Sequence, residues 1–249
     1  MDLDGLEAQM GKLRTAIRQA TAAGRHAEAR ALRARLREAE RQWDTGVEQP
    51  SAQPALVPVR EQVHRALTLL GAPTAAKMIV AVDESFFDGQ MANTQLTSLR
   101  RDEEKSYRSA PGARPYYLCA ALTSELLSPA RGLLALSTWE LPQRIIGPLS
   151  PRTDFLTSAI RLAEHLTRLE TASPGAFRLL GRLAQNIPGG ADGFGPGDPA
   201  RVIAAAEAEL AVHQERDQMD RREAAARAAD RLGPVEQLFG SGVKAVRSA

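Results

Sequence analysis

Two clusters of glycine and proline divide the chain and limit what it can fold into. Residues 45–58, TGVEQPSAQPALVP, contain three prolines and no hydrophobic periodicity, which predicts a linker. The segment NIPGGADGFGPGDP predicts a second long loop, which we place at residues 187–198. These breaks separate an N-terminal segment, a central body and a C-terminal segment.

Residues 1–44 carry two apolar stripes, each with the three- and four-residue spacing of one helix face. The stripes predict a helical hairpin, or one long helix kinked near Gly24. Because each stripe is narrow, we expect it to pack on the other stripe, on the body or on a second copy of the chain. The apolar residues are Leu3, Leu6, Met10, Leu13 and Ile17, then Ala29, Leu32, Leu36, Ala39 and Trp43.

The C-terminal segment, residues 199–249, has clear signals for one long helix and a tail. Asp198 is a predicted N-cap, and Pro199 takes the first helical position. An alanine-rich run then continues to about Leu232, before a stop at Gly233 and Pro234. A helix of this length predicts a partner helix, from the N-terminal hairpin or from a second subunit.

The central body begins with two short helices. Pro58 opens the first one, and Gly71 ends it after Leu70. Thr74 is the predicted cap of the second helix, TAAKMIVAVDESFF. The short loop DGQMAN then turns the chain into a third helix, so this spacing indicates a helix-turn-helix.

The third helix, from Thr94 to about Tyr107, is the most polar of the three. Its side chains are of the types that bond phosphate oxygens and base edges, which favours a recognition helix. Three acids, Asp102, Glu103 and Glu104, interrupt it: they could face away, pair with arginines, accept from cytosine or indicate a protein partner. The candidate DNA-binding residues here are Thr94, Gln95, Thr97, Ser98, Arg100, Arg101, Lys105 and Arg108.

Two strands follow the third helix. Residues 116–122, YYLCAAL, and 133–139, LLALSTW, have the composition of a β-hairpin. The ten residues between them exceed a tight turn, so we expect a large connection or one helical turn starting at Thr123.

The succession helix, helix, basic helix and hairpin in residues 59–147 resembles the winged helix-turn-helix DNA-binding superfamily and is similar to bacterial regulators. The resemblance implies that the hairpin, or wing, touches DNA through Arg114 and Arg131. It also implies a dimer interface in the helices appended at residues 148–186. Two-fold symmetry would match a palindromic operator with half-sites about one DNA turn apart.

The bulk properties limit the remaining possibilities. With 32 basic and 30 acidic side chains the formal charge is +2, so any contact with nucleic acid must be local. Cys119 is the only cysteine, which excludes an intramolecular disulfide and fits the cytoplasm. We find no secretory signal and no apolar run of about 20 residues, and so expect no membrane partner.

Signals for catalysis, metals and cofactors are missing from the sequence. The four histidines fall in separate predicted helices without ligand spacing. Ser85 lies outside any GxSxG elbow, and the glycine-rich loop matches neither the phosphate-loop nor the dinucleotide pattern. We therefore expect no enzyme, no metal site and no cofactor.

The sequence predicts a mainly α protein with a small β-hairpin: a winged helix-turn-helix core flanked by an N-terminal helical hairpin and long C-terminal helices. The function expected from it is sequence-specific binding of duplex DNA, as a dimeric transcriptional regulator. Repression, activation and an architectural role remain open. The alternative is an assembly scaffold, in which the winged helix and the terminal helices bind protein partners.

Overall fold

The computed structural model describes residues 57–193 and 195–240, except the side chain of Thr97, and a few residues between 13 and 36. The chain divides into two units, Met1–Leu56 and Val57–Ala249. In the first unit, Leu13 packs against Leu32 and Leu36, so the two predicted stripes meet at these residues. The rest of the predicted hairpin, the linker up to residue 56 and the tail at 241–249 lie outside the described residues.

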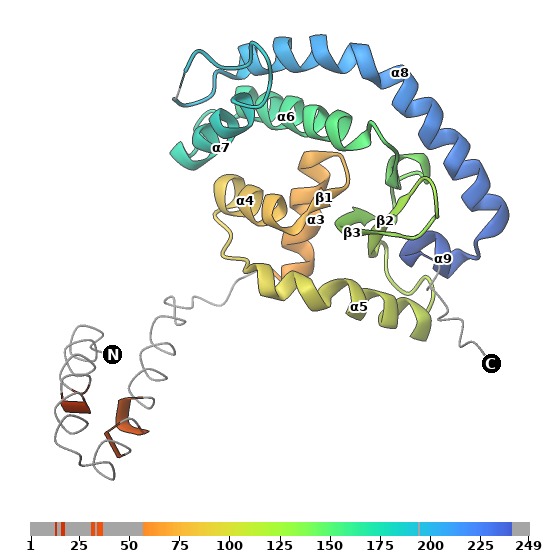
Figure 1. The fold of residues 1–249 in the computed structure, drawn as a ribbon, viewed down its shortest axis with the longest axis horizontal. Coiled ribbons are helices and arrows are strands. Elements are labelled where there is room, and N and C mark those ends of the chain that lie inside the picture. The colour runs from red at the N-terminus through yellow and green to blue at the C-terminus, as the bar shows by residue number, and fades with distance from the viewer. Residues whose placement is uncertain are drawn as a thin grey trace. The chain divides into compact units, whose positions relative to one another are not determined.

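The second unit is mainly helical and contains a small four-stranded sheet, as Figure 1 shows. Its helices are α3 (Val59–Leu70), α4 (Ala76–Phe87), α5 (Asn93–Ser109), α6 (Ser150–Arg168), α7 (Pro174–Ala184), α8 (Pro199–Arg231) and α9 (Pro234–Phe239). Its strands are β1 (Thr74–Ala75), β2 (Leu118–Thr123), β3 (Pro129–Leu136) and β4 (Ile145–Ile146), and a 3-10 turn, η1 (Pro142–Arg144), precedes β4.

Helix α3 confirms the predicted start and stop. It follows Pro58 and ends at Gly71, whose φ of 70° lies in the left-handed region that glycine tolerates. Arg161 of α6 donates to the carbonyls of Thr68 and Leu69, both at 2.9 Å. The last carbonyls of α3, which have no partner within the helix, are therefore satisfied from α6.

The predicted N-cap at Thr74 is wrong. Thr74 lies in β1, pairs with Leu134 of β3, and donates its hydroxyl to the carbonyl of Ala72 at 2.7 Å. Helix α4 starts two residues later, and no side chain caps it. A two-residue strand is too short to show alternation, so the capping pattern was the only local signal.

The sheet has the order β1-β3-β2-β4: β3 is antiparallel to both β1 and β2, and β4 is parallel to β2. Strand β3 starts four residues earlier than predicted and ends before Ser137, so the connection is short. It is one turn, in which the Leu127 amide donates to Thr123 and the Thr123 amide donates to Ser128. The expected large wing is therefore wrong, and the single turn starting at Thr123 is nearer to the structure.

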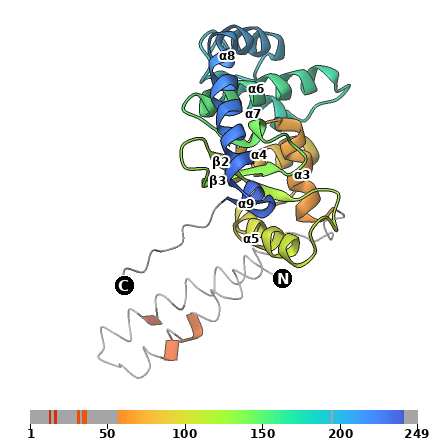
Figure 2. The same ribbon diagram turned by 90° about the vertical axis from the view of Figure 1, so that its right-hand side faces the viewer.

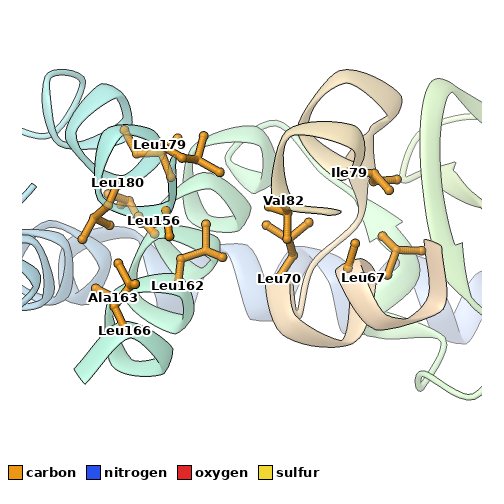
Figure 3. Close-up of a cluster of buried hydrophobic side chains, with 14 of the residues drawn as sticks. Leu67, Leu70, Ile79, Val82, Leu156, Leu162, Ala163, Leu166, Leu179 and Leu180 are labelled. Carbon is orange, nitrogen blue, oxygen red and sulfur yellow. The ribbon is translucent and has the colours of Figure 1, made fainter. Parts of the chain in front are cut away.

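The core of the second unit joins the first two helices to the appended ones. Leucines of α3 and apolar residues of α4 lie on one side, and leucines of α6 and α7 on the other (Figure 3). The labelled members are Leu67, Leu70, Ile79, Val82, Leu156, Leu162, Ala163, Leu166, Leu179 and Leu180. The appended helices thus share one hydrophobic core with α3 and α4.

Helix α8 confirms the predicted long C-terminal helix. The side chain of Asp198 accepts from the Ala200 amide at 3.1 Å, as an N-cap does. The helix packs along α6 and continues past η1 and β4 toward α9 (Figures 1 and 2). Within the second unit its partner helix is α6, which the sequence did not predict. None of the helices that the structure describes is long and apolar enough to span a membrane.

Candidate nucleic-acid interface

The turn between α4 and α5 depends on a close approach at Gly89. Asp88 adopts a left-handed φ of 51°, and the Gly89 amide donates to the carbonyl of Asp83 at 3.1 Å. A Cβ at Gly89 would overlap the Asp83 carboxylate. Burial raises the pKa of Asp83, while Arg65, with a nitrogen 3.7 Å from its carboxylate, opposes this shift. Helix α5 lies at the end of the unit away from α7 in both views (Figures 1 and 2).

The inner face of α5 holds the helix to the body. Leu96 is buried, and Leu99 packs on the main core. Tyr107 lies edge-on to Tyr117, with ring centroids 5.0 Å apart. These positions are three and eight residues apart, spacings close to one and two helical turns, so they lie on one side of the helix.

Glu103 is the buried acid of this inner face, with 3% of its side chain exposed. Its Oε1 accepts from the guanidinium groups of Arg60 and Arg114, each at 2.8 Å. Its Oε2 accepts from the amide of Leu118 at 3.0 Å. One carboxylate therefore ties α5 to α3, to the loop before β2 and to the sheet. Of the alternatives for the three acids, pairing with arginines is confirmed for Glu103.

The outer face of α5 carries five exposed polar residues in one stripe: Thr94, Ser98, Arg101, Lys105 and Arg108. Their steps of four, three, four and three residues put them on the side opposite Glu103. We call these five residues the outer stripe. The structure thus brings half of the predicted contact residues together on one surface.

The other predicted residues of α5 have different surroundings. The Oε1 of Gln95 accepts from the Ala92 amide at 2.9 Å, so this side chain closes the start of the helix. Arg100 is half-buried, and the side chain of Thr97 lies outside the described part. Within the stripe, Arg108 pairs with Glu104 at 2.8 Å, whereas Arg101 and Lys105 form no ion pair with any described residue.

The two predicted wing residues differ in position. Arg131 is exposed near the start of β3, next to the hairpin turn. Arg114 precedes β2, outside the hairpin, and its guanidinium pairs with Glu103. The partner on α5 therefore holds the Arg114 side chain, and a contact of Arg114 with DNA stays a prediction.

The tip of the hairpin is docked on α8. Leu127 is buried in a small cluster with Ala224, Ala225 and Ala228 of that helix. Arg227 of α8 donates to the carbonyl of Ser124 at 2.7 Å. The neighbouring Leu126 remains 76% exposed. The chain's own C-terminal helix therefore occupies one side of the hairpin turn.

A buried arginine fixes α9 beside the sheet. Arg144 donates to the carbonyls of Trp139 and Gln237, at 3.2 and 2.8 Å. Cys119 lies next to it and is fully buried, which raises its pKa to about 11. Cys119 is thus a small buried side chain, and its thiol stays protonated at neutral pH.

The packing of α6 on α8 includes a buried polar network that the sequence did not reveal. The Asp217 carboxylate accepts from Ser150 at 2.6 Å, from Thr153 at 2.7 Å and from Arg221 at 2.7 Å. Arg221 also donates to Asp154 at 2.6 Å. Burial, with a smaller contribution from Asp217, raises the pKa of Asp154 to about 6 against the opposing effect of Arg221. The only local signal was the four-residue spacing of Asp217 and Arg221.

Among the described residues, no three His, Cys, Asp or Glu side chains are arranged to hold a metal ion. Comparison of the chain with protein-family models, with curated proteins and with solved structures finds no match.

Proposed function

We propose that the protein binds duplex DNA through the outer stripe of α5. The observation that carries the proposal is the separation of the two faces of this helix. Its acid with the most partners, Glu103, points inward, whereas Arg101 and Lys105 point outward without ion partners among the described residues. Phosphate oxygens and the guanine edge are the acceptors that such side chains bind.

The arrangement around α5 supports a winged-helix mode of binding. Helix α5 follows α4 after a short turn, α3 packs on α4, and β2 and β3 form the hairpin that follows. The outer stripe extends over four turns, or about 21 Å, and a helix fits the B-DNA major groove, which is about 12 Å wide. Arg131 would then contact the backbone beside the groove.

The role we propose is a transcriptional regulator that acts by occupying its site. A two-fold dimer would present two α5 helices to half-sites about 34 Å apart. Selection from a random duplex library should then return a palindromic sequence. A selected site without symmetry would contradict the dimer and leave the helix contact intact.

The direct test is a titration of mixed-sequence duplex DNA at about 50 and 200 mM salt. The variant Arg101→Ala, Lys105→Ala should bind about tenfold or more weakly at the lower salt, with a salt slope reduced by about 2. The matched control is Arg168→Ala, Arg231→Ala, which removes two exposed arginines from the ends of α6 and α8. If both variants bind alike, or the wild type shows no salt dependence, the proposal fails.

A second function, as a protein assembly scaffold, is favoured by the docked hairpin. A wing held by Leu127 and Arg227 against α8 is less free to enter a groove. The exposed Leu126 beside it offers an apolar contact to a protein. If the wild type fails to bind DNA at low salt, Leu126→Ser in an interaction assay becomes the next measurement.

A further inference from the structure

A cavity of about 270 Å³ lies where the helix-turn-helix, the sheet and the appended helices meet. Its wall is mainly apolar and is drawn from six elements and the segment before β1. The apolar side chains are Pro73, Met78, Leu133, Ile146, Phe155 and Leu183. The body of a ligand in this space must therefore be compact and apolar.

The hydroxyl groups in this wall are already satisfied by the protein. Thr74 donates to the carbonyl of Ala72 at 2.7 Å, and Ser158 donates to the carbonyl of Leu70 at 3.3 Å. Asp154 is the one charged lining residue. Its Oδ1 accepts from Arg221, whereas its Oδ2 is shielded from solvent and has no hydrogen-bond partner among the described residues. Among the described side-chain atoms of this wall, the one that lacks a hydrogen-bond partner is thus a negatively charged acceptor, Oδ2 of Asp154.

The charges around Asp154 do not balance. Asp154 and Asp217 share the single guanidinium of Arg221, so the buried group carries an excess of one negative charge. A second cavity, of about 310 Å³, lies beyond Asp154 and is lined also by Glu140 and Arg222, whose charges cancel. Asp154 is the residue that lines both cavities. A buried, unbalanced carboxylate favours a cationic partner.

We propose that the apolar cavity binds a small apolar primary amine, with the ammonium group at the Asp154 carboxylate and the hydrocarbon body against Met78, Leu133 and Phe155. An ammonium donates up to three hydrogen bonds, so at this carboxylate it would add charge-assisted hydrogen bonds and neutralise the excess charge. The cavity wall supplies the favourable burial of the body. The inference does not depend on DNA binding, because its test contains no nucleic acid.

The test compares three ligands with the same aromatic body and different charge: 2-phenylethylamine, 2-phenylethanol and phenylacetate. Calorimetry and the thermal unfolding midpoint of the full chain are measured at about pH 8, where Asp154 is ionised. The amine should bind about tenfold more tightly than the alcohol, and phenylacetate should not bind. Because this series uses the wild type, it needs no variant to fold.

Two variants locate the site. Asp154→Asn should abolish the preference for the amine, and Met78→Trp should fill the cavity and abolish binding of both the amine and the alcohol. The matched control is Asp102→Asn, which removes an exposed carboxylate of α5 and should bind the amine as the wild type does. The inference is overturned if the three ligands behave alike, if none binds, or if the preference survives in Asp154→Asn.

Discussion

Two segments of nearly the same composition use their charges in opposite ways. Residues 100–105 of α5, RRDEEK, and residues 216–222 of α8, RDQMDRR, each contain three bases together with two or three acids. In α5 one acid is buried and the bases Arg101 and Lys105 remain exposed. In α8 an acid and a base, Asp217 and Arg221, are both buried against α6.

The difference shows that charge content does not identify a functional surface. Helix α8 packs along α6, so the two charged residues on its buried face, Asp217 and Arg221, find their partners inside the protein. Helix α5 contacts the body on one face, which frees the other for a ligand. Substitutions should therefore act on stability in α8 and at Glu103, and on binding in the outer stripe.

The largest effect is expected for Arg221→Met. The substitution leaves Asp154 and Asp217 close together without their shared cation, so the free energy of unfolding should fall by about 3–5 kcal/mol. Urea unfolding measures it. The adjacent, exposed Arg222→Met is the control and should change stability by less than about 0.5 kcal/mol. Equal effects would contradict the buried network.

The next effect is a pH dependence of stability set by Asp154. Burial raises its pKa from 3.8 to about 6, so between these values the folded state holds a proton that the unfolded state has released. The stability contributed by protonated Asp154 is therefore present at low pH and is lost as the pH rises through about 6. A shift of this size corresponds to about 3 kcal/mol.

Asp154→Asn tests this sign. The difference in unfolding free energy, variant minus wild type, should increase by up to about 3 kcal/mol from pH 4 to pH 7. Urea titrations at each pH measure the difference, in which the contributions of all other groups cancel. A difference that stays constant with pH would show that Asp154 titrates normally.

A smaller loss is expected for Glu103→Gln. The amide keeps one acceptor, but it loses the charge that attracts Arg60 and Arg114, so stability should fall by about 1–2 kcal/mol. Glu104→Gln is the matched control, since its partner Arg108 is exposed and such pairs contribute little. If Glu104→Gln lowers the stability as much as Glu103→Gln does, the buried carboxylate contributes no more to stability than the partly exposed one.

The sequence predicted the features that depend on neighbouring residues, and missed those that depend on contacts between residues far apart in the chain. The ends of α3 and the N-cap of α8 were predicted because proline, glycine and aspartate act on the residues next to them. The burial of Glu103 was not predicted, because its partner Arg60 lies 43 residues earlier in the chain. The pairing of Asp154 with Arg221 was missed for the same reason. The two residues are 67 positions apart, and their helices come into contact only in the folded chain.

The candidate interface was also predicted only in its local features, which are the residues that share one face of α5. Helical periodicity alone groups Arg101, Lys105 and Arg108 on one face, and the structure has them there. The apolar positions Leu96 and Tyr107 on the opposite face also indicate which side is covered, and in the structure they meet the core and the sheet. The ion pair of Arg114 with Glu103 was not predicted, because it joins a loop and a helix that meet only in the folded chain.

The smallest effect on stability is expected for the residues with the largest proposed effect on binding. Arg101→Ala, Lys105→Ala should change the free energy of unfolding by less than about 0.5 kcal/mol per residue, because both side chains are exposed and form no ion pair with described residues. Urea unfolding of this variant beside Glu103→Gln checks the expectation. A loss as large as that of Glu103→Gln would mean that the outer stripe supports the fold, and its weaker DNA binding could then no longer be assigned to lost contacts. A variant that keeps its stability and loses its affinity would separate the two faces of α5 by function.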